Sequence, residues 1–303
     1  NATQGWVPTI DEAVTDAPSK GNQEGIFGYG DAFKTNLVSN TGVVSTDVTG
    51  VGTDRLNLAA CEYGEDKGIF GFGYDGSSYL SMTNLVSNSG VVGTDVTGVG
   101  TARYAITACS YGGDKGIFGF GQEVPGQTGV TNLVSDAGVV ASDTAAVGTA
   151  RFAPAACEYG EDKGIFGFGY AGTSYVSMSN LVSNAGVVAS DVTGVGTDRR
   201  HLAGCGYGYD KGIFGYGYTG SSKVSMTNLV SNVGVVASDV TGVGTDRGFL
   251  AATQYGGDKG IFGFGGSGGA LSMTNLVSNA GVVATDVTGV GTARHYPGAC
   301  SFN

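Results

Sequence analysis

The chain has 303 residues, of which 41% are hydrophobic and 14% charged, and its formal net charge is −11. Because no basic cluster interrupts this acidic composition, we expect no nucleic-acid partner, and anionic membrane surfaces are disfavoured for the same reason. No apolar run approaches the length of a membrane span and no signal-peptide pattern remains at the start, so membrane insertion is not expected.

Glycine supplies 57 of the residues, a level that disordered low-complexity chains also reach. The hydrophobic content argues against disorder, because each repeat carries a Phe/Ile/Val cluster that is able to bury surface. Short runs rich in Val, Ile, Phe, Tyr and Thr alternate with Gly, Asn, Asp and Ser, and helical stripes are absent. This pattern predicts an all-β protein.

The N-terminal segment, residues 1–23, does not match the repeats that follow it. It contains the only tryptophan, Trp6, and has more acidic than basic residues. We expect a connector or a cover strand that packs on the rest of the protein. Since the chain starts with Asn rather than Met, we also expect it to be a trimmed or processed fragment.

The remainder of the chain is a six-fold repeat, which decides the predicted architecture. Most equivalent positions are 48 residues apart, as Arg55 and Arg103 are. A unit of this length suits a four-stranded propeller blade better than a leucine-rich repeat. The GIFG-type cores begin at Gly25, Gly68, Gly116, Gly164, Gly212 and Gly260, and the matching arginines are Arg55, Arg103, Arg151, Arg199, Arg247 and Arg294.

One unit divides into four predicted strands, here given for the third GIFG core. The first strand covers residues 104–111, and GGDK turns it into the second, 116–121. A loop over residues 122–130 leads from the second strand to the third, 131–135. We call this loop and its equivalents in the other units the b–c loop. Asp136-Ala-Gly then turns the chain into the fourth strand, 139–141.

The constancy of GIFG predicts how neighbouring units stack. Side chains alternate along a strand, so we expect Phe70 and Phe72 on one face and Ile69 and Gly71 on the other. A unit with rings on one side and a glycine notch on the other can stack on a copy of itself.

The two ends of the repeat region predict how the ring closes. The chain enters at a second strand, 25–30, and ends in a first strand, 295–302, that no second strand follows. We therefore expect the C-terminal strand to complete the first blade, whose other strands come from residues 25–48. Such closure removes open sheet edges. The predicted fold is a six-bladed β-propeller of four-stranded blades over residues 24–303.

The order of features within a unit resembles the kelch-type β-propeller repeat. An arginine, a small-residue strand, a turn, an aromatic strand ending near glycine and two outer strands follow one another in each copy. The units are more similar still to the kelch-like repeats of tail-fibre and appendage proteins of marine bacteriophages. Two features depart from kelch: the aromatic strand ends in Gly-Phe-Gly or Gly-Tyr-Gly rather than a double glycine, and Val91-Val92 and its copies stand where an outer-strand tryptophan is common.

Two repeated residue types are interpreted as structural. Cysteines occupy one first-strand position in five units, with Thr253 in the sixth, which predicts small core residues facing a neighbouring blade and no disulfides. The repeated aspartates are expected to pair with the arginines or to cap a turn. The cysteines are Cys61, Cys109, Cys157, Cys205 and Cys300, and the aspartates are Asp47, Asp95, Asp143, Asp191, Asp239 and Asp286.

Catalysis is not expected. The two histidines, His201 and His295, have no metal-ligand spacing and are interpreted as residues on the rim of a channel. Some kelch-like propellers are copper oxidases, but two isolated histidines supply no comparable ligand set. We expect no cofactor and no metal.

Two places vary sharply between the six copies while the rest stays nearly fixed: the residues after the arginine and the b–c loop. Strand direction puts both places on one side of the ring, with the near-constant turns on the other. A rigid scaffold that presents varied loops fits a binding surface, and drift in exposed loops is the alternative. The expected ligand-binding residues are Tyr74, Tyr79, Tyr104, Phe152, Tyr170, Tyr175, His201, Tyr218, Phe249, His295 and Tyr296, with the six arginines at the rim.

The resemblance to phage proteins implies a non-enzymatic receptor-binding or appendage protein of a virion, or an extracellular one. Aromatic side chains with polar neighbours can stack on sugar rings, so the expected partner is a cell-surface glycan or a protein receptor. The alternative is a structural spacer or assembly module that binds another virion protein.

Overall fold

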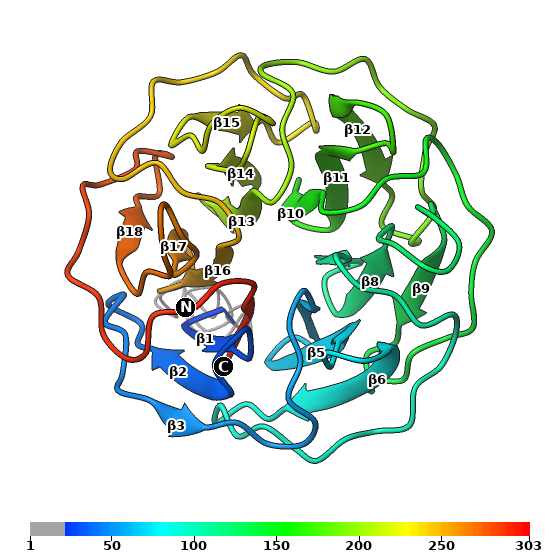
Figure 1. Ribbon diagram of the computed structural model, residues 1–303, viewed down its shortest axis with the longest axis horizontal. Coiled ribbons are helices and arrows are strands. Elements are labelled where there is room, and N and C mark those ends of the chain that lie inside the picture. Colours follow the sequence, from blue (N-terminus) through cyan, green and yellow to red (C-terminus); the bar gives the residue numbers. More distant parts are fainter. Residues whose placement is uncertain (1–21) are drawn as a thin grey trace, which may run out of the picture.

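The structure, a computed structural model, describes residues 22–303. In this part of the chain, nineteen strands form six small antiparallel sheets that stand around a common centre (Figure 1). We number the sheets 1 to 6 in chain order. The all-β prediction is confirmed.

The strands of the six sheets follow the repeat of the sequence. Sheet 1 contains β1 (Glu24–Gly28), β2 (Lys34–Val38), β3 (Val48–Thr49) and β19 (Gly298–Phe302). Sheets 2 and 3 contain β4 (Ala59–Tyr63), β5 (Lys67–Tyr74), β6 (Tyr79–Val86), β7 (Thr107–Tyr111), β8 (Lys115–Gly119) and β9 (Thr131–Val134). Sheets 4 and 5 contain β10 (Ala155–Tyr159), β11 (Lys163–Tyr170), β12 (Tyr175–Val182), β13 (Ala203–Tyr207), β14 (Lys211–Gly215) and β15 (Thr227–Val230). Sheet 6 contains β16 (Ala251–Tyr255), β17 (Lys259–Gly263) and β18 (Thr274–Val277).

The C-terminal strand joins the N-terminal sheet, as the sequence predicts. β19 pairs antiparallel with β1, from Glu24 opposite Phe302 to Gly28 opposite Gly298. The C-terminus therefore lies beside β1 (Figure 1). The predicted connector over residues 1–23 lies outside the described residues except for its last two. Of these, Gln23 donates its N–H to Asn303 O at 3.2 Å and accepts from Gly256 N at 2.9 Å, which links sheet 1 to a turn of sheet 6.

The prediction of a fourth strand in every sheet is wrong, because only sheet 1 has one. In sheet 3, residues 139–144 make two isolated bridges, Val134 with Val140 and Thr131 with Thr144. We call these residues and their equivalents in the other units the outer segment. These bridges span one more residue on the outer segment than on β9, which is the geometry of a β-bulge. The bulge turns backbone groups away from the ladder, and the side chain of Asn132 donates to Ala141 O at 3.0 Å instead.

The glycines of GIFG are the places where neighbouring sheets approach most closely. A Cβ atom on Gly119 of sheet 3 would lie 2.8 Å from the Phe166 ring of sheet 4. A Cβ on Gly116 would lie 2.5 Å from Cys61 Sγ of sheet 2. All five cysteines are buried and free, which confirms their predicted role as small core residues. GIFG is constant because both of its glycines receive side chains, each from a different neighbour.

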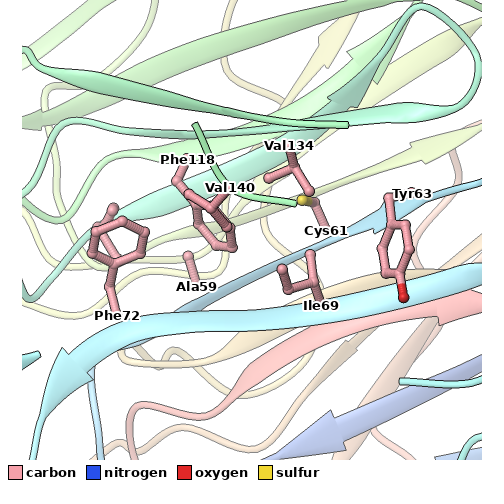
Figure 2. Close-up of a cluster of buried hydrophobic side chains, with 9 residues drawn as sticks. Ala59, Cys61, Tyr63, Ile69, Phe72, Phe118, Val134 and Val140 are labelled. Atoms are coloured by element: carbon pink, nitrogen blue, oxygen red, sulfur yellow. The ribbon is translucent and has the colours of Figure 1, made fainter. Parts of the chain in front are cut away.

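The faces predicted for the second strand need one correction. Phe70 and Phe72 do not share a face: Phe70 enters the Gly28 notch of sheet 1, whereas Phe72 packs with Ile69 against sheet 3. Figure 2 shows Phe72 beside Phe118, and their ring centroids are 5.1 Å apart. The alternation fails because Phe72 has a φ of 63° and the register with β6 shifts between Gly71 and Gly73.

The notch makes a prediction for stability. Gly119→Val should lower the free energy of unfolding by about 1–3 kcal/mol, because the added branches occupy the space of the Phe166 ring. The control is Gly126→Val, since a Cβ there meets no atom within 4 Å. Thermal or urea unfolding measures both. Equal stability of the two variants would contradict the stacking described here.

Candidate ligand-binding face

Each of sheets 2 to 6 presents three variable positions at one of its ends. The first follows the repeated arginine, the second follows the Gly-Phe-Gly or Gly-Tyr-Gly segment, and the third lies in the b–c loop. In sheet 4 these are Phe152, Tyr170 and Tyr175, and the backbone of Tyr170 pairs with both of the others. The structure thus brings the two variable regions of the sequence together. We call this end of the six sheets the variable face and the opposite end the constant face.

All eleven expected ligand-binding side chains are half-buried on the variable face. Three of them form one group between sheets 2 and 3, in which the Tyr79 and Tyr104 rings stack with centroids 4.6 Å apart. The other eight form a continuous group through ring contacts with centroid separations of 4.5–6.4 Å. The first group is Tyr74, Tyr79 and Tyr104, and the second is Phe152, Tyr170, Tyr175, His201, Tyr218, Phe249, His295 and Tyr296.

A ring of backbone hydrogen bonds positions the side chains nearest the centre. Six residues, one from each sheet, donate their N–H to the carbonyl of the equivalent residue in the previous sheet, over N···O distances of 2.7–3.3 Å. Each has a φ between 50° and 63°, a conformation that non-glycine residues seldom adopt. The hydrogen bonds offset that strain and hold three of the aromatic side chains at fixed positions. The six residues are Asn57, Ala105, Ala153, His201, Phe249 and Tyr296.

The two histidines have different surroundings on this face. Desolvation, assisted by the charge of Arg200, lowers the pKa of His201 to about 3, so its imidazole is neutral at physiological pH. His295 Nδ1 lies 2.9 Å from Asp31 Oδ2, and the backbone N–H of His295 donates to Asp31 Oδ1 at 2.6 Å. These contacts fix the His295 ring in sheet 1.

A groove of about 620 Å³ opens beside the first aromatic group. Its volume falls within the range of small-molecule sites in proteins. One side of the groove is held by Asp75, whose Oδ1 accepts from the N–H groups of Ser77 and Ser78 at 2.8 and 2.7 Å. The lining combines aromatic rings with hydroxyl groups and consists of Tyr74, Ser77, Ser78, Tyr79, Thr101, Ala102 and Val124.

The prediction that the six repeated arginines lie at the rim of the binding face is wrong, because all six are buried. Their relative exposures are 0–1%. Arg55 illustrates the arrangement: its guanidinium lies 4.5 Å from the centroid of the Tyr29 ring of sheet 1. Its Nε donates to Phe72 O at 2.9 Å and its Nη2 donates to Asn84 Oδ1 at 2.6 Å, both in sheet 2. The arginines therefore connect sheets and are not available to a ligand.

The repeated aspartates hold the connections between sheets, which confirms their predicted structural role. In sheet 3, Asp143 accepts from Thr101 N at 3.0 Å and from Asn132 Nδ2 at 2.8 Å. We call this arrangement the aspartate clasp. Burial raises the pKa of Asp143, but hydrogen bonds from Thr101 and Asn132 and the charge of Arg103 outweigh it, so the pKa lies below its ordinary value of 3.8.

Sequence reasoning missed two kinds of residue on the variable face. The serines of the groove gave no signal, because serine is common in surface loops. Arg200 did give one: it is the only cation at a position that holds Leu, Tyr, Phe, Gly or His in the other units. Its guanidinium lies over four aromatic rings of sheets 4 and 5.

Comparisons with protein-family models and with curated proteins find no match for the chain. Over residues 22–303, His, Cys, Asp and Glu side chains form no group of three or more that could hold a metal ion. The same residues contain no helix of the length and apolarity needed to cross a membrane.

The aspartate clasp predicts a pH-dependent loss of stability. A carboxyl whose pKa is lowered by folding stabilises the protein above its unfolded pKa, and this contribution disappears as the pH falls through the lower folded pKa. Asp143→Asn should therefore cost about 1–3 kcal/mol at pH 7, and the difference from the original protein should shrink below pH 4. Asp136→Asn, an exposed aspartate of the same repeat, is the control. Unfolding curves from pH 7 to pH 2.5 would refute the clasp if Asp143→Asn and Asp136→Asn behaved alike.

Proposed function

We propose that the six sheets are the blades of a closed six-bladed β-propeller of the kelch type, completed by β19. Three contacts between sheets 6 and 1 support closure. Gly263 of sheet 6 faces the Phe27 ring of sheet 1, as Gly119 faces Phe166. Asp47 of sheet 1 clasps Thr292, accepting from its N–H at 3.0 Å. β19 of sheet 1 also contacts β16 of sheet 6.

Closure predicts the effect of a truncation. Removing residues 295–303 should expose β1 as an unpaired edge and cause aggregation, because the five residues of β19 supply its partner strand. Light scattering and thermal melting measure the outcome. A soluble truncated protein with the melting temperature of the full chain would show that the ring does not depend on β19.

For the function, we propose a non-enzymatic recognition module, a receptor-binding or appendage protein of a phage that binds a cell-surface glycan through the variable face. The observation that carries this proposal is the gathering of eleven aromatic and imidazole side chains on one end of a scaffold that is otherwise nearly constant. Their positions vary between units, whereas the notches, clasps and buried arginines do not.

The chemistry of the face suits sugars. Tyrosine combines a flat apolar ring, which can cover the C–H face of a pyranose, with a hydroxyl that can hydrogen-bond to sugar hydroxyls. The groove adds the hydroxyls of Ser77, Ser78 and Thr101 beside Tyr74 and Tyr79. Because the units provide several such positions, weak binding at one can be strengthened by simultaneous binding at others.

One observation favours the alternative, an assembly module that binds another virion protein. On the constant face, a valine of each turn before the outer segment is exposed in all six units, with relative exposures of 63–65%. A repeated set of exposed apolar side chains is a feature of protein interfaces. These valines are Val43, Val91, Val139, Val187, Val235 and Val282.

A paired experiment separates the two functions. Changing Tyr79, Tyr104, Tyr175 and Phe249 to Ala should abolish glycan or cell attachment, since aromatic anchors dominate contact energy. The protein should remain folded because none of the four belongs to a core between sheets.

The matched control changes four exposed valines of the constant face, Val91, Val139, Val187 and Val235, to Ser. A glycan array and a cell-attachment assay compare both variants with the original protein. Attachment that survives the aromatic changes and is lost with the valine changes would overturn the glycan proposal and favour assembly through the constant face.

A further inference from the structure

The basic side chains of this acidic protein are distributed unevenly. Five lysines of the constant face each pair with the aspartate before them, as Lys163 pairs with Asp162 at 2.5 Å. Six arginines are buried between sheets. Among residues 22–303 this leaves Lys34, Arg200 and Lys223, which form no ion pair with a carboxylate of this part of the chain. Two of these three, Arg200 and Lys223, occupy variable positions of sheet 5.

Arg200 lies among the aromatic side chains without a hydrogen-bond acceptor among residues 22–303. Its guanidinium carbon is 5.1 Å from the ring centroids of Phe152 and Tyr170, 5.4 Å from that of Tyr175 and 6.0 Å from that of Tyr218. Its Nε is buried and has no hydrogen-bond partner among the described residues. The rings orient the guanidinium plane but accept none of its N–H groups in a conventional hydrogen bond. Arg200 therefore retains hydrogen-bond donors that no acceptor of the described residues uses.

Lys223 gives sheet 5 a second positive charge, which is turned toward sheet 6 rather than toward sheet 4. In sheet 5 the three variable positions are Arg200, Tyr218 and Lys223, where sheet 4 has Phe152, Tyr170 and Tyr175. Lys223 Nζ lies 5.3 Å from the Phe249 ring centroid and donates to Ser267 O. In sheet 6 the same three positions hold the small residues Gly248, Gly266 and Ala270, and the large side chain of that sheet that Lys223 meets is Phe249.

We propose that this part of the variable face, at sheets 4 and 5, binds the carboxylate of an acidic sugar, a uronic or sialic acid residue of a glycan. The proposal rests on the proposed glycan-binding function and specifies its ligand. A planar guanidinium pairs with a carboxylate through two parallel N–H···O bonds, and Tyr170 and Tyr175 offer rings against which the sugar can pack. Since the net charge of −11 repels anions at long range, an acidic ligand needs a local cation such as Arg200. The groove between sheets 2 and 3, whose lining contains no cation, is assigned to neutral sugars.

The test compares acidic sugars with neutral partners of the same shape. The probes are sialyllactose and trigalacturonate, each with its own methyl ester, measured by isothermal titration calorimetry on the full chain. The two pairs distinguish sialic from uronic acid. We expect at least tenfold tighter binding of one acidic member, as hydrogen bonds between charged groups provide.

Three variants assign that preference to Arg200. Arg200→Gln removes the charge and should reduce the preference to less than about threefold while leaving the affinity for the neutral member unchanged. Arg200→Lys keeps the charge without the planar pair of donors and should retain part of the preference. Lys34→Gln, which removes the remaining unpaired cation in sheet 1, should retain all of it. Preference for the acid that survives Arg200→Gln would overturn the proposal.

The original protein provides an independent measurement if Arg200→Gln fails to fold. Its affinity for the acidic sugar should fall between 50 and 500 mM NaCl, because salt screens the charge pair, and its affinity for the neutral sugar should not. Equal binding of acidic and neutral sugars would overturn the acidic ligand and leave the glycan function standing. Binding of none of the four probes, together with a glycan array without signal, would overturn both.

Discussion

The structure depends most on how neighbouring sheets fit together at the two glycines of GIFG. In each sheet, one glycine receives an aromatic ring from the next sheet and the other receives a small side chain from the previous sheet. Gly116 faces Cys61 of the sheet before it, and Gly119 faces Phe166 of the sheet after it. A Cβ atom at either place would have to push a sheet away, since it would come within 2.8 Å of its neighbour. With the same contact repeated between successive sheets, each sheet is fitted on both sides. The ring contacts, the buried arginines and the variable face all require this spacing.

The buried arginines join the sheets at a second level. Each lies over an aromatic ring of the previous sheet, with the guanidinium carbon 3.8–4.8 Å from the ring centroid. That ring stands on a residue of positive φ, such as Phe120 at 62°, which turns it out of the strand alternation and toward the next sheet. Burial lowers the pKa of Arg151 to about 10 against the opposing charge of Asp191, so the guanidinium stays charged at neutral pH. Hydrogen bonds and the nearby carboxylate offset the cost of burying that charge.

The variable face can change because its backbone is held independently of its side chains. The first and second variable positions pair through main-chain hydrogen bonds, for example Phe152 N to Tyr170 O at 3.1 Å. The same pairing occurs in sheet 6 between Gly248 and Gly266, which have no side chains. Substitution at these positions therefore leaves the main-chain hydrogen bonds of the scaffold in place. A surface of this kind can exchange a ring for a cation, as sheet 5 does with Arg200, without losing the geometry that orients either.

The repeat length, the order of strands and the pairing of the C-terminal strand with β1 were all predictable from the sequence, because local patterns repeated six times average out the ambiguity of any one copy. The side chains that would share the variable face were predictable for the same reason, since strand direction alone brings the two variable regions to one end. Only the tertiary structure decided that Phe72 faces away from Phe70, that the outer segment is bulged, and that the arginines are buried. These depend on positive φ angles and on partners 17 to 42 residues away or in another sheet, such as Phe72 O and Asn84 for Arg55, and Asp95 for Thr53. A sequence pattern carries strand periodicity, whereas a reversal of that periodicity arises from packing against a neighbour that the pattern does not contain.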